Sequence, residues 1–187
     1  QAIQQAWRAE LGKRDVPDQE MLGRTLLGNR LMFMRTGTAP TGDEVAGFLQ
    51  RAFQVPVYDM YGSTEAGYVS FENRITDSVV YAHCLVNVPE LGYLTSDTPY
   101  PRGELRIKTV CGTVGYLENA QASRDLFDAN GFIKTGDIFE HRPNGEYIWI
   151  DRCSNVVKLA HGEFVSLWRL ESLYVDESEL ISQIYLH

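Results

Sequence analysis

Residues 31–67 read LMFMRTGTAPTGDEVAGFLQRAFQVPVYDMYGSTEAG, and this stretch decides the fold class. Its first four residues form a short apolar run, which predicts a buried strand over Leu31–Met34. Val45 and the apolar residues three, four and seven positions after it share one face of a predicted helix over Asp43–Phe53. A second strand is predicted over Val55–Tyr58. The order strand, helix, strand is a βαβ unit, so we expect an α/β protein containing part of a parallel sheet.

The sequence after Glu72 is typical of a small antiparallel β-sheet or barrel, because short runs with a period of two are separated by turn residues. The predicted strands are Val79–Val88, Gly92–Thr95, Glu104–Thr109, Asp137–Arg142 and Glu146–Asp151. The last two flank Pro143-Asn144-Gly145 and should form a hairpin. A short helix is predicted over Ser166–Tyr174 and a final strand over Leu180–Leu186. Residues 1–28 have a polar, helical pattern.

The composition is that of an ordinary globular domain. The chain has 187 residues, of which 44% are hydrophobic and 22% charged, and its formal net charge is −8. An acidic chain disfavours nonspecific nucleic-acid binding, which depends on Lys and Arg. No uncharged run approaches the roughly 20 apolar residues of a membrane helix, so no membrane span is expected. The three cysteines form no CxxC pair, which favours a reducing, cytoplasmic location.

A first candidate site is the loop Gly37-Thr38-Ala39-Pro40, which follows the first predicted strand. Small residues allow a flat ligand to approach the backbone closely. Loops that follow parallel strands open on the sheet edge where α/β proteins bind ligands. A plain strand-to-helix turn explains the same residues, and it is the commoner reading for this loop alone.

A second candidate is Tyr61-Gly62-Ser63-Thr64-Glu65-Ala66-Gly67, predicted as the loop after the second strand. Its hydroxyl groups can donate hydrogen bonds to phosphate oxygens, and its carboxylate can hold Mg²⁺, which prefers oxygen ligands. A helix N-cap formed by Ser63, Thr64 or Glu65 is the simpler alternative. A serine-hydrolase nucleophile is excluded, because the Gly-x-Ser-x-Gly spacing is absent.

A third candidate joins Lys134-Thr135-Gly136-Asp137 to Asp151-Arg152. Asp137 begins one strand of the predicted hairpin and Arg152 follows the other, so pairing of the strands could bring the two together. A carboxylate in such a place can bind ribose hydroxyls. A salt bridge at the strand ends is the alternative.

Taken in this order, the three motifs resemble those of adenylate-forming enzymes, a superfamily that includes acyl-CoA synthetases and nonribosomal-peptide adenylation domains. Three further stretches resemble the adenylation domain of carboxylic acid reductases more closely. They are Val88–Tyr93, Pro101–Leu105 and the long run Asp151–Val165. The resemblance extends from about Leu31 to the last residue, and the long run is its most specific part.

The resemblance implies that a carboxylic acid and ATP form an acyl-adenylate with the help of Mg²⁺, and that AMP is later released. The acyl group would pass to a phosphopantetheine thiol on a carrier-protein domain, and a reductase domain that uses NADPH would release it as an aldehyde. Thr64 and Glu65 would be catalytic, with Glu65 as the metal ligand. The implied nucleotide-binding residues are Gly37, Thr38, Ala39, Pro40, Tyr61, Gly62, Ser63, Thr64, Asp137, Arg152 and Lys158.

The resemblance also implies a division of the chain. Residues 1–151 would be the C-terminal part of the large adenylation core, and 152–187 the truncated beginning of a small, mobile C-terminal lid subdomain. Ser154 would be the hinge, where the family commonly has Asp or Lys. The family's phosphate loop and its catalytic lysine near the end of the lid are absent, so we expect this chain alone to be inactive.

Two other functions remain open at this point. The chain could be part of a freestanding fatty acyl-CoA synthetase or of a synthase-associated adenylation domain. Alternatively, it could be a non-catalytic nucleotide-binding fragment. Retention of Thr64, Glu65, Asp137 and Arg152 argues against the non-catalytic reading.

Overall fold

The computed structural model describes residues 27, 28, 30–37, 41–178, 180, 181 and 183–186. Nearly all of the predicted N-terminal helical segment, and the site candidates Thr38, Ala39 and Pro40, therefore lie outside the described residues. The chain forms two compact units, Gln1–Asp59 and Met60–His187, each of which is described by itself.

The first unit contains the predicted βαβ order, with β1 (Met34–Gly37), α3 (Asp43–Phe53) and the beginning of β2 (Val57–Ser63). The Met34 amide donates to the Pro56 carbonyl at 2.8 Å, and the Thr36 hydroxyl donates to the Tyr58 carbonyl at 3.4 Å. These contacts join residue 34 to residue 56 and residue 36 to residue 58, so the residue numbers rise together along the two strands. The strands are therefore parallel, as predicted. Ala52 and Phe53 of α3 form the buried centre of this unit.

Both strands of this unit begin later than predicted. The predicted buried strand over Leu31–Met34 is wrong for its first three residues, since β1 starts at Met34 and Met32 is 80% exposed. Among the described residues 30–37, the Met34 amide is the first that donates to the backbone of the neighbouring strand. Strand β2 starts at Val57 because Pro56 has no N–H to donate to a strand ladder.

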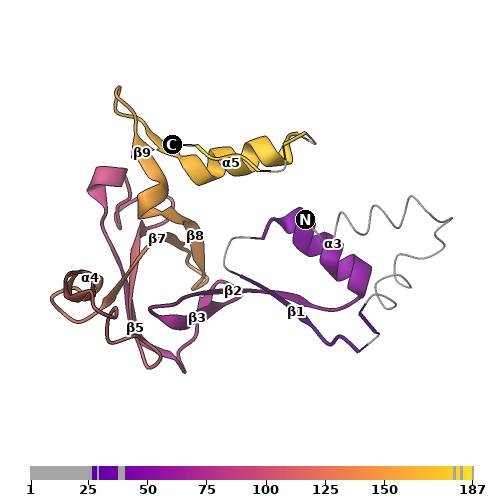
Figure 1. Cartoon of the computed structure of the whole chain (residues 1–187), viewed down its shortest axis with the longest axis horizontal. Helices are drawn as coiled ribbons and strands as arrows, with labels where there is room; N and C mark the ends of the chain where they lie inside the picture. The colour runs from indigo at the N-terminus through magenta and orange to yellow at the C-terminus, as the bar shows by residue number, and fades with distance from the viewer. Residues whose placement is uncertain (1–26, 29, 38–40, 179, 182, 187) are drawn as a thin grey trace. The chain divides into compact units, whose positions relative to one another are not determined.

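The second unit is built on an antiparallel sheet in the order β5-β6-β7-β8 (Figure 1). Its strands are β5 (Val80–Val86), β6 (Arg102–Thr109), β7 (Ile133–His141) and β8 (Tyr147–Arg152). The sheet confirms the predicted small antiparallel element and the predicted hairpin. Its outer strands β5 and β8 do not pair with each other among the described residues, so it is an open sheet and not a barrel.

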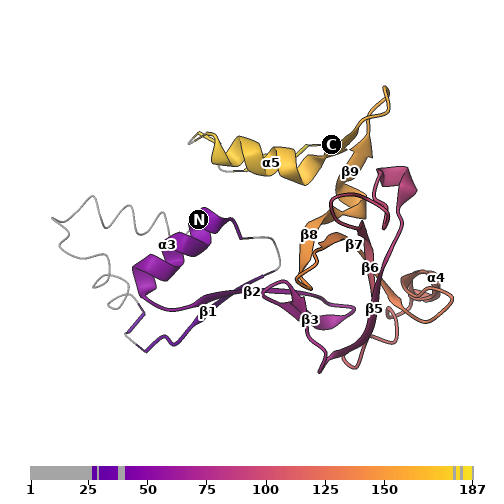
Figure 2. The same cartoon turned by 180° about the vertical axis from the view of Figure 1, so that it is seen from behind.

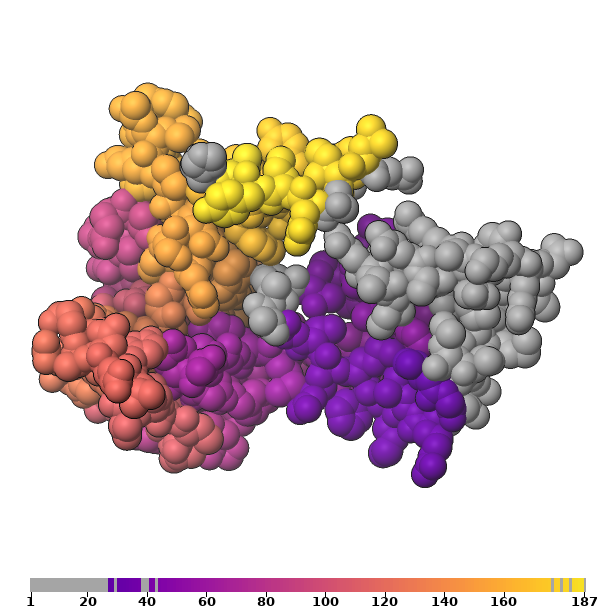
Figure 3. Space-filling view, in the orientation of Figure 1, coloured from indigo at the N-terminus to yellow at the C-terminus, as the bar shows by residue number. Residues whose placement is uncertain are grey.

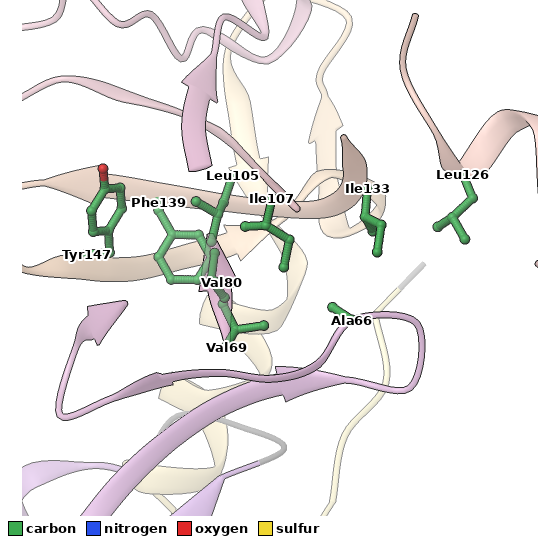
Figure 4. Packing of buried hydrophobic residues seen from close by; sticks show 9 residues of the cluster. All are labelled: Ala66, Val69, Val80, Leu105, Ile107, Leu126, Ile133, Phe139 and Tyr147. Carbon is green, nitrogen blue, oxygen red and sulfur yellow. The ribbon is translucent and has the colours of Figure 1, made fainter. Parts of the chain in front are cut away.

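A short hairpin packs against this sheet. The end of β2 pairs with β3 (Gly67–Phe71), which pairs with β4 (Arg74–Ile75). Figure 4 shows Val69 of this hairpin beside Val80, Leu105 and Phe139 of the sheet, and Ala66 belongs to the same buried cluster. All five side chains are almost completely buried, and burying a large apolar side chain contributes about 1.5–3 kcal/mol. The core therefore fixes the hairpin, and the motif within it, on the sheet.

Two other predicted strands are absent. Residues 92–95 contain no strand, because η1 (Pro89–Leu91) turns the chain and only Val88 and Tyr93 form an isolated bridge. The described residues of 180–186 also form no strand. Leu180 is 96% exposed, and the Leu186 amide donates to the Glu171 carboxylate of a helix at 2.7 Å. Helix α4 (Ala120–Leu126), which lies beside the sheet (Figure 2), was not predicted.

The last part of the chain follows β8 directly. It contains η2 (Cys153–Asn155), the hairpin of β9 (Val156–Lys158) and β10 (Phe164–Ser166), and α5 (Leu167–Asp176). The predicted C-terminal helix is confirmed, with Ser166 as its N-cap: the hydroxyl accepts a hydrogen bond from the Arg169 amide at 3.1 Å. The expected domain border between residues 151 and 152 stays a prediction.

The three cysteines should differ sharply in reactivity. Cys111 is exposed, whereas burial raises the pKa of Cys84 and raises that of Cys153 to about 11. Only the thiolate attacks an alkylating reagent. We expect iodoacetamide at pH 8 to modify Cys111 well before Cys84 and Cys153, as followed by peptide mass spectrometry. Equal rates in the native protein would contradict this arrangement, and equal rates in urea would provide the control.

Candidate functional site

A buried carboxylate lies at the centre of the candidate site. Asp137 of β7 is 1% exposed, and three donors from two other strands, β2 and β8, surround it. Its Oδ2 accepts a hydrogen bond from the Tyr61 hydroxyl at 2.7 Å, and its Oδ1 accepts one from Arg152 Nε at 3.0 Å. Trp149 Nε1 also approaches Oδ1, at 3.4 Å. The structure therefore brings together Tyr61, Asp137 and Arg152 from the predicted set, and adds a tryptophan that the sequence analysis missed.

An irregularity in the β7–β8 hairpin creates this cluster. Asp137 pairs with Arg152 and Phe139 pairs with Trp149, so one strand has an extra residue, Ile150, between these pairs. Side chains three positions apart on a regular strand point to opposite faces. The bulge at Ile150 instead places Trp149 and Arg152 on the face that carries Asp137.

The backbone around Asp137 is also held in an irregular form. Gly136 has a φ of +69°, and its amide donates to the buried Glu104 carboxylate at 3.2 Å. The Asp137 amide donates to the Thr135 hydroxyl at 3.2 Å. Arg106 Nε donates to the same Glu104 carboxylate at 2.9 Å and partly neutralises it. Glu104 is therefore a second residue that supports the site and that the sequence analysis missed.

Tyr61 acts as a neutral donor in this cluster. Burial and the negative charge of Asp137 raise the pKa of the Tyr61 hydroxyl far above its ordinary value. Its ring packs edge-to-face on Phe139, with 4.9 Å between the ring centres. Because the Asp137 carboxylate is buried, a hydroxyl group of a ligand reaches it only if Tyr61 or Arg152 shifts its side chain.

The motif that begins at Tyr61 differs from the predicted loop. Tyr61, Gly62 and Ser63 are the last residues of β2, and only the next three residues form the turn to β3. The Ser63 hydroxyl accepts a hydrogen bond from the Ala66 amide at 3.1 Å; this bond closes a turn between two strands, so the alternative of a helix N-cap is wrong. A Cβ on Gly62 would lie 2.4 Å from the Gly67 carbonyl oxygen, so no side chain fits there. Thr64 is exposed at the turn.

Glu65 forms a second, smaller cluster at this turn. Its Oε1 accepts a hydrogen bond from the Tyr116 hydroxyl at 2.7 Å. This bond lowers the pKa of Glu65, so the carboxylate is ionised at neutral pH. The described residues contain no group of three or more His, Cys, Asp or Glu side chains able to hold a metal. One ionised carboxylate does fit Mg²⁺ held mainly by substrate phosphates and water, which is its common mode of binding.

The other predicted site residues lie elsewhere. Gly37 ends β1 in the first unit. Ser154 is exposed in η2, where its hydroxyl is 3.4 Å from the Asn155 side-chain oxygen. Lys158 is exposed in β9, and its ammonium group lies 5.3 Å from the centre of the Phe164 ring. None of the helices in the described ranges has the length and apolar character that a membrane crossing requires.

No protein-family model matches the chain. Among curated proteins, it is 42% identical over 166 residues to a carboxylic acid reductase of Segniliparus rugosus. The alignment covers 89% of this chain and 14% of that protein, so the chain spans about one seventh of this relative's length.

Solved structures of carboxylic acid reductase domains also match the chain. The adenylation domain of the S. rugosus reductase, in complex with AMP and a co-purified carboxylic acid, matches with a TM-score of 0.83 and 39% identity. That match covers 92% of this chain and 29% of the other. A didomain of the same reductase, which contains the adenylation and carrier domains and AMP, matches with a TM-score of 0.86 and 38% identity, covering 100% of this chain and 27% of the other.

Proposed function

Because the chain is homologous to part of the adenylation domain of carboxylic acid reductases, we propose that it forms part of a nucleotide site in an enzyme that activates carboxylic acids with ATP. A carboxylate oxygen of the acid would attack the α-phosphorus of ATP. The bond to the β,γ-phosphates would break, which gives an acyl-adenylate and pyrophosphate. The Tyr61–Asp137–Arg152 cluster carries this proposal, because it is a built polar site in a chain that matches AMP-bound domains.

The cluster suits the sugar of the nucleotide. Ribose hydroxyls would donate to the Asp137 carboxylate once the Tyr61 or Arg152 side chain shifts, and the donors that remain would hold that carboxylate in place. The Tyr61 ring would lie near the base, and Thr64 would donate to the α-phosphate from the exposed turn. Such groups accelerate the reaction chiefly by positioning and by stabilising charge.

The remaining roles follow the same homology. Residues 37–40 would line the adenine, and Lys158 would complete the nucleotide-binding set. Gly62, Ser63 and Gly67 would border the acid, where the glycines leave room for it. Residues 1–151 would belong to the large core and 152–187 to a small lid that turns about Ser154.

Glu65 would hold Mg²⁺ together with the phosphates of ATP. When bound, the ion would neutralise charge on those phosphates. The structure supports this role through the ionised state of Glu65 and through Tyr116, which fixes one of its oxygens.

Later steps would occur on other domains of the full-length protein. The carrier domain beside the similar adenylation domain of S. rugosus supports transfer of the acyl group to a phosphopantetheine thiol. A reductase domain with NADPH would then release an aldehyde, and we place the protein in the cytoplasm.

Pyrophosphate exchange tests the proposal in the full-length protein. Labelled pyrophosphate should enter ATP only when a carboxylic acid and Mg²⁺ are present. Aldehyde formation on adding NADPH would identify a reductase, whereas an acyl-CoA product on adding CoA would identify a synthetase. AMP binding without any exchange, across a panel of aliphatic and aromatic acids, would establish the non-catalytic alternative.

Replacing Tyr116 with phenylalanine tests the metal assignment. We expect the Mg²⁺ concentration for half-maximal exchange to rise about tenfold, since removing a hydrogen bond that orients a metal ligand commonly has this effect. The matched control is Tyr81→Phe, a change at a tyrosine that is 66% exposed in β5, which should leave the Mg²⁺ dependence unaltered. An unchanged Mg²⁺ requirement in Tyr116→Phe would remove the support for Glu65 as the ligand.

A further inference from the structure

Trp149 contacts two separate parts of the second unit. Its indole N–H points to the Asp137 carboxylate at 3.4 Å. Its ring meets Trp168 of α5 edge-to-face, with 5.1 Å between the ring centres and an angle of 88° between the planes. In Figure 3, the surface of the C-terminal segment that contains α5 adjoins the orange surface of the preceding residues. One side chain therefore bridges the buried carboxylate and the last helix.

The hairpin bulge is what makes this bridge. Without the extra residue Ile150, Trp149 would lie on the opposite face of β8 from Arg152 and could not reach Asp137. Bulges beside functional sites commonly redirect a single side chain in this way. Here the redirected side chain is the one that touches α5.

Aromatic rings contribute to the contacts between the segment after Arg152 and the preceding sheet and loops. One is the Trp149–Trp168 pair. Another is Phe164 of β10, whose ring packs on Gly92: a Cβ added there would lie 3.5 Å from two ring carbons. Of these two contacts, only the tryptophan pair leads to the carboxylate.

We propose that Trp149 is a positioning residue that couples nucleotide binding at Asp137 to the docking of α5 through Trp168. The proposal rests on the nucleotide function proposed for Asp137. A ligand that orders the carboxylate also orders the indole hydrogen-bonded to it, and the indole is one half of the contact that holds α5. Because such coupling is reciprocal, docked α5 favours nucleotide binding and bound nucleotide favours docked α5.

Calorimetric titration of the full-length protein with AMP provides the first test. Trp168→Leu removes the ring from α5 without altering any group on Asp137, and we expect the Kd for AMP to rise about three- to tenfold. Trp168→Phe keeps an aromatic partner and should restore most of the affinity. Trp149→Phe should weaken binding by a similar factor, and the double variant should be no weaker than the weaker single variant. The matched control is Leu173→Ala, which removes an apolar side chain that is 54% exposed on the same helix and should leave the Kd unchanged.

The second test measures the reverse direction. Arg169 is exposed in α5, the helix that carries Trp168, so trypsin should cleave after it when the helix undocks and opens. AMP should slow this cleavage in the wild type and in Leu173→Ala, but not in Trp168→Leu. A purely structural role for Trp168 would change cleavage with and without AMP by the same factor.

The outcomes separate the two proposals. If the wild-type protein does not bind AMP, the proposed function fails. If it binds AMP but Trp168→Leu binds equally well, or if the effects of the two tryptophan variants multiply in the double variant, the coupling is overturned and the proposed function stands.

Discussion

Replacing Asp137 with alanine is expected to weaken AMP binding by the full-length protein about ten- to a hundredfold. Hydrogen bonds to a charged group contribute about 1.5–3 kcal/mol each, which corresponds to this range of affinities. The carboxylate is also the shared acceptor for Tyr61, Trp149 and Arg152, so its loss removes the group that organises all three. Isothermal calorimetry of AMP binding measures the effect directly.

Two further variants make the result interpretable. Tyr61→Phe removes a donor but leaves the Asp137–Arg152 ion pair, so the Kd should change by less than that of Asp137→Ala. Asp97→Ala breaks a comparable ion pair, with Arg102 at 2.9 Å, away from the cluster, and it should leave AMP affinity unchanged. A folded Asp137→Ala protein with wild-type affinity would show that the cluster is a structural ion pair and not a ribose site.

The approach of Asp137 to Arg152 could be predicted from sequence because a hairpin is set by a local pattern. Alternating side chains on either side of Pro143-Asn144-Gly145 predict the hairpin and bring the ends of its strands together. Regular pairing from His141 and Tyr147 would place Asp137 opposite Asp151, and the bulge at Ile150 shifts its partner to Arg152. The helix Asp43–Phe53 was predictable for the same reason, since its periodicity lies within one short segment.

The features that complete the site depend on distant residues and leave no local pattern. The bulge at Ile150 depends on hydrogen bonds across the sheet. It could not be predicted, because the residues around it alternate as they do in a regular strand. Glu104 supports Gly136 from another strand, and Tyr116 reaches Glu65 across 51 residues of sequence. The strands predicted over 92–95 and 180–186 failed because a short apolar run needs a neighbouring strand to pair with.

Replacing Gly62 with alanine should destabilise the β2–β3 hairpin. The added Cβ would lie 2.4 Å from the Gly67 carbonyl oxygen and 3.3 Å from the Tyr68 Cα, and both are backbone atoms that cannot rotate away. Forcing an extra methyl group into a packed site costs about 1–3 kcal/mol or more. Hydrogen–deuterium exchange of peptides that cover residues 60–71 should therefore accelerate by about five- to a hundredfold.

Gly47→Ala provides the matched control. It makes the same chemical change inside α3, where the new Cβ meets only the flexible guanidinium of Arg51 at 3.1 Å. Alanine in a helix interior is favoured over glycine by about 0.5–1 kcal/mol, so exchange in residues 43–53 should slow. Slowed exchange there, combined with accelerated exchange in 60–71 of Gly62→Ala, would show that the position and not the methyl group decides the effect.

The hairpin also connects the two clusters of the site, which gives Gly62→Ala a functional consequence. Tyr61 precedes Gly62 and Glu65 follows it by three residues, while Ala66 and Val69 hold the turn in the core. A turn that shifts to relieve the clash must move the Tyr61 hydroxyl or the Glu65 carboxylate, because the buried residues resist displacement. We expect Gly62→Ala to lose AMP affinity and to raise the Mg²⁺ requirement together, whereas Tyr116→Phe alters only the latter. Normal exchange and normal affinity in Gly62→Ala would mean that the hairpin absorbs the methyl group without moving either side chain.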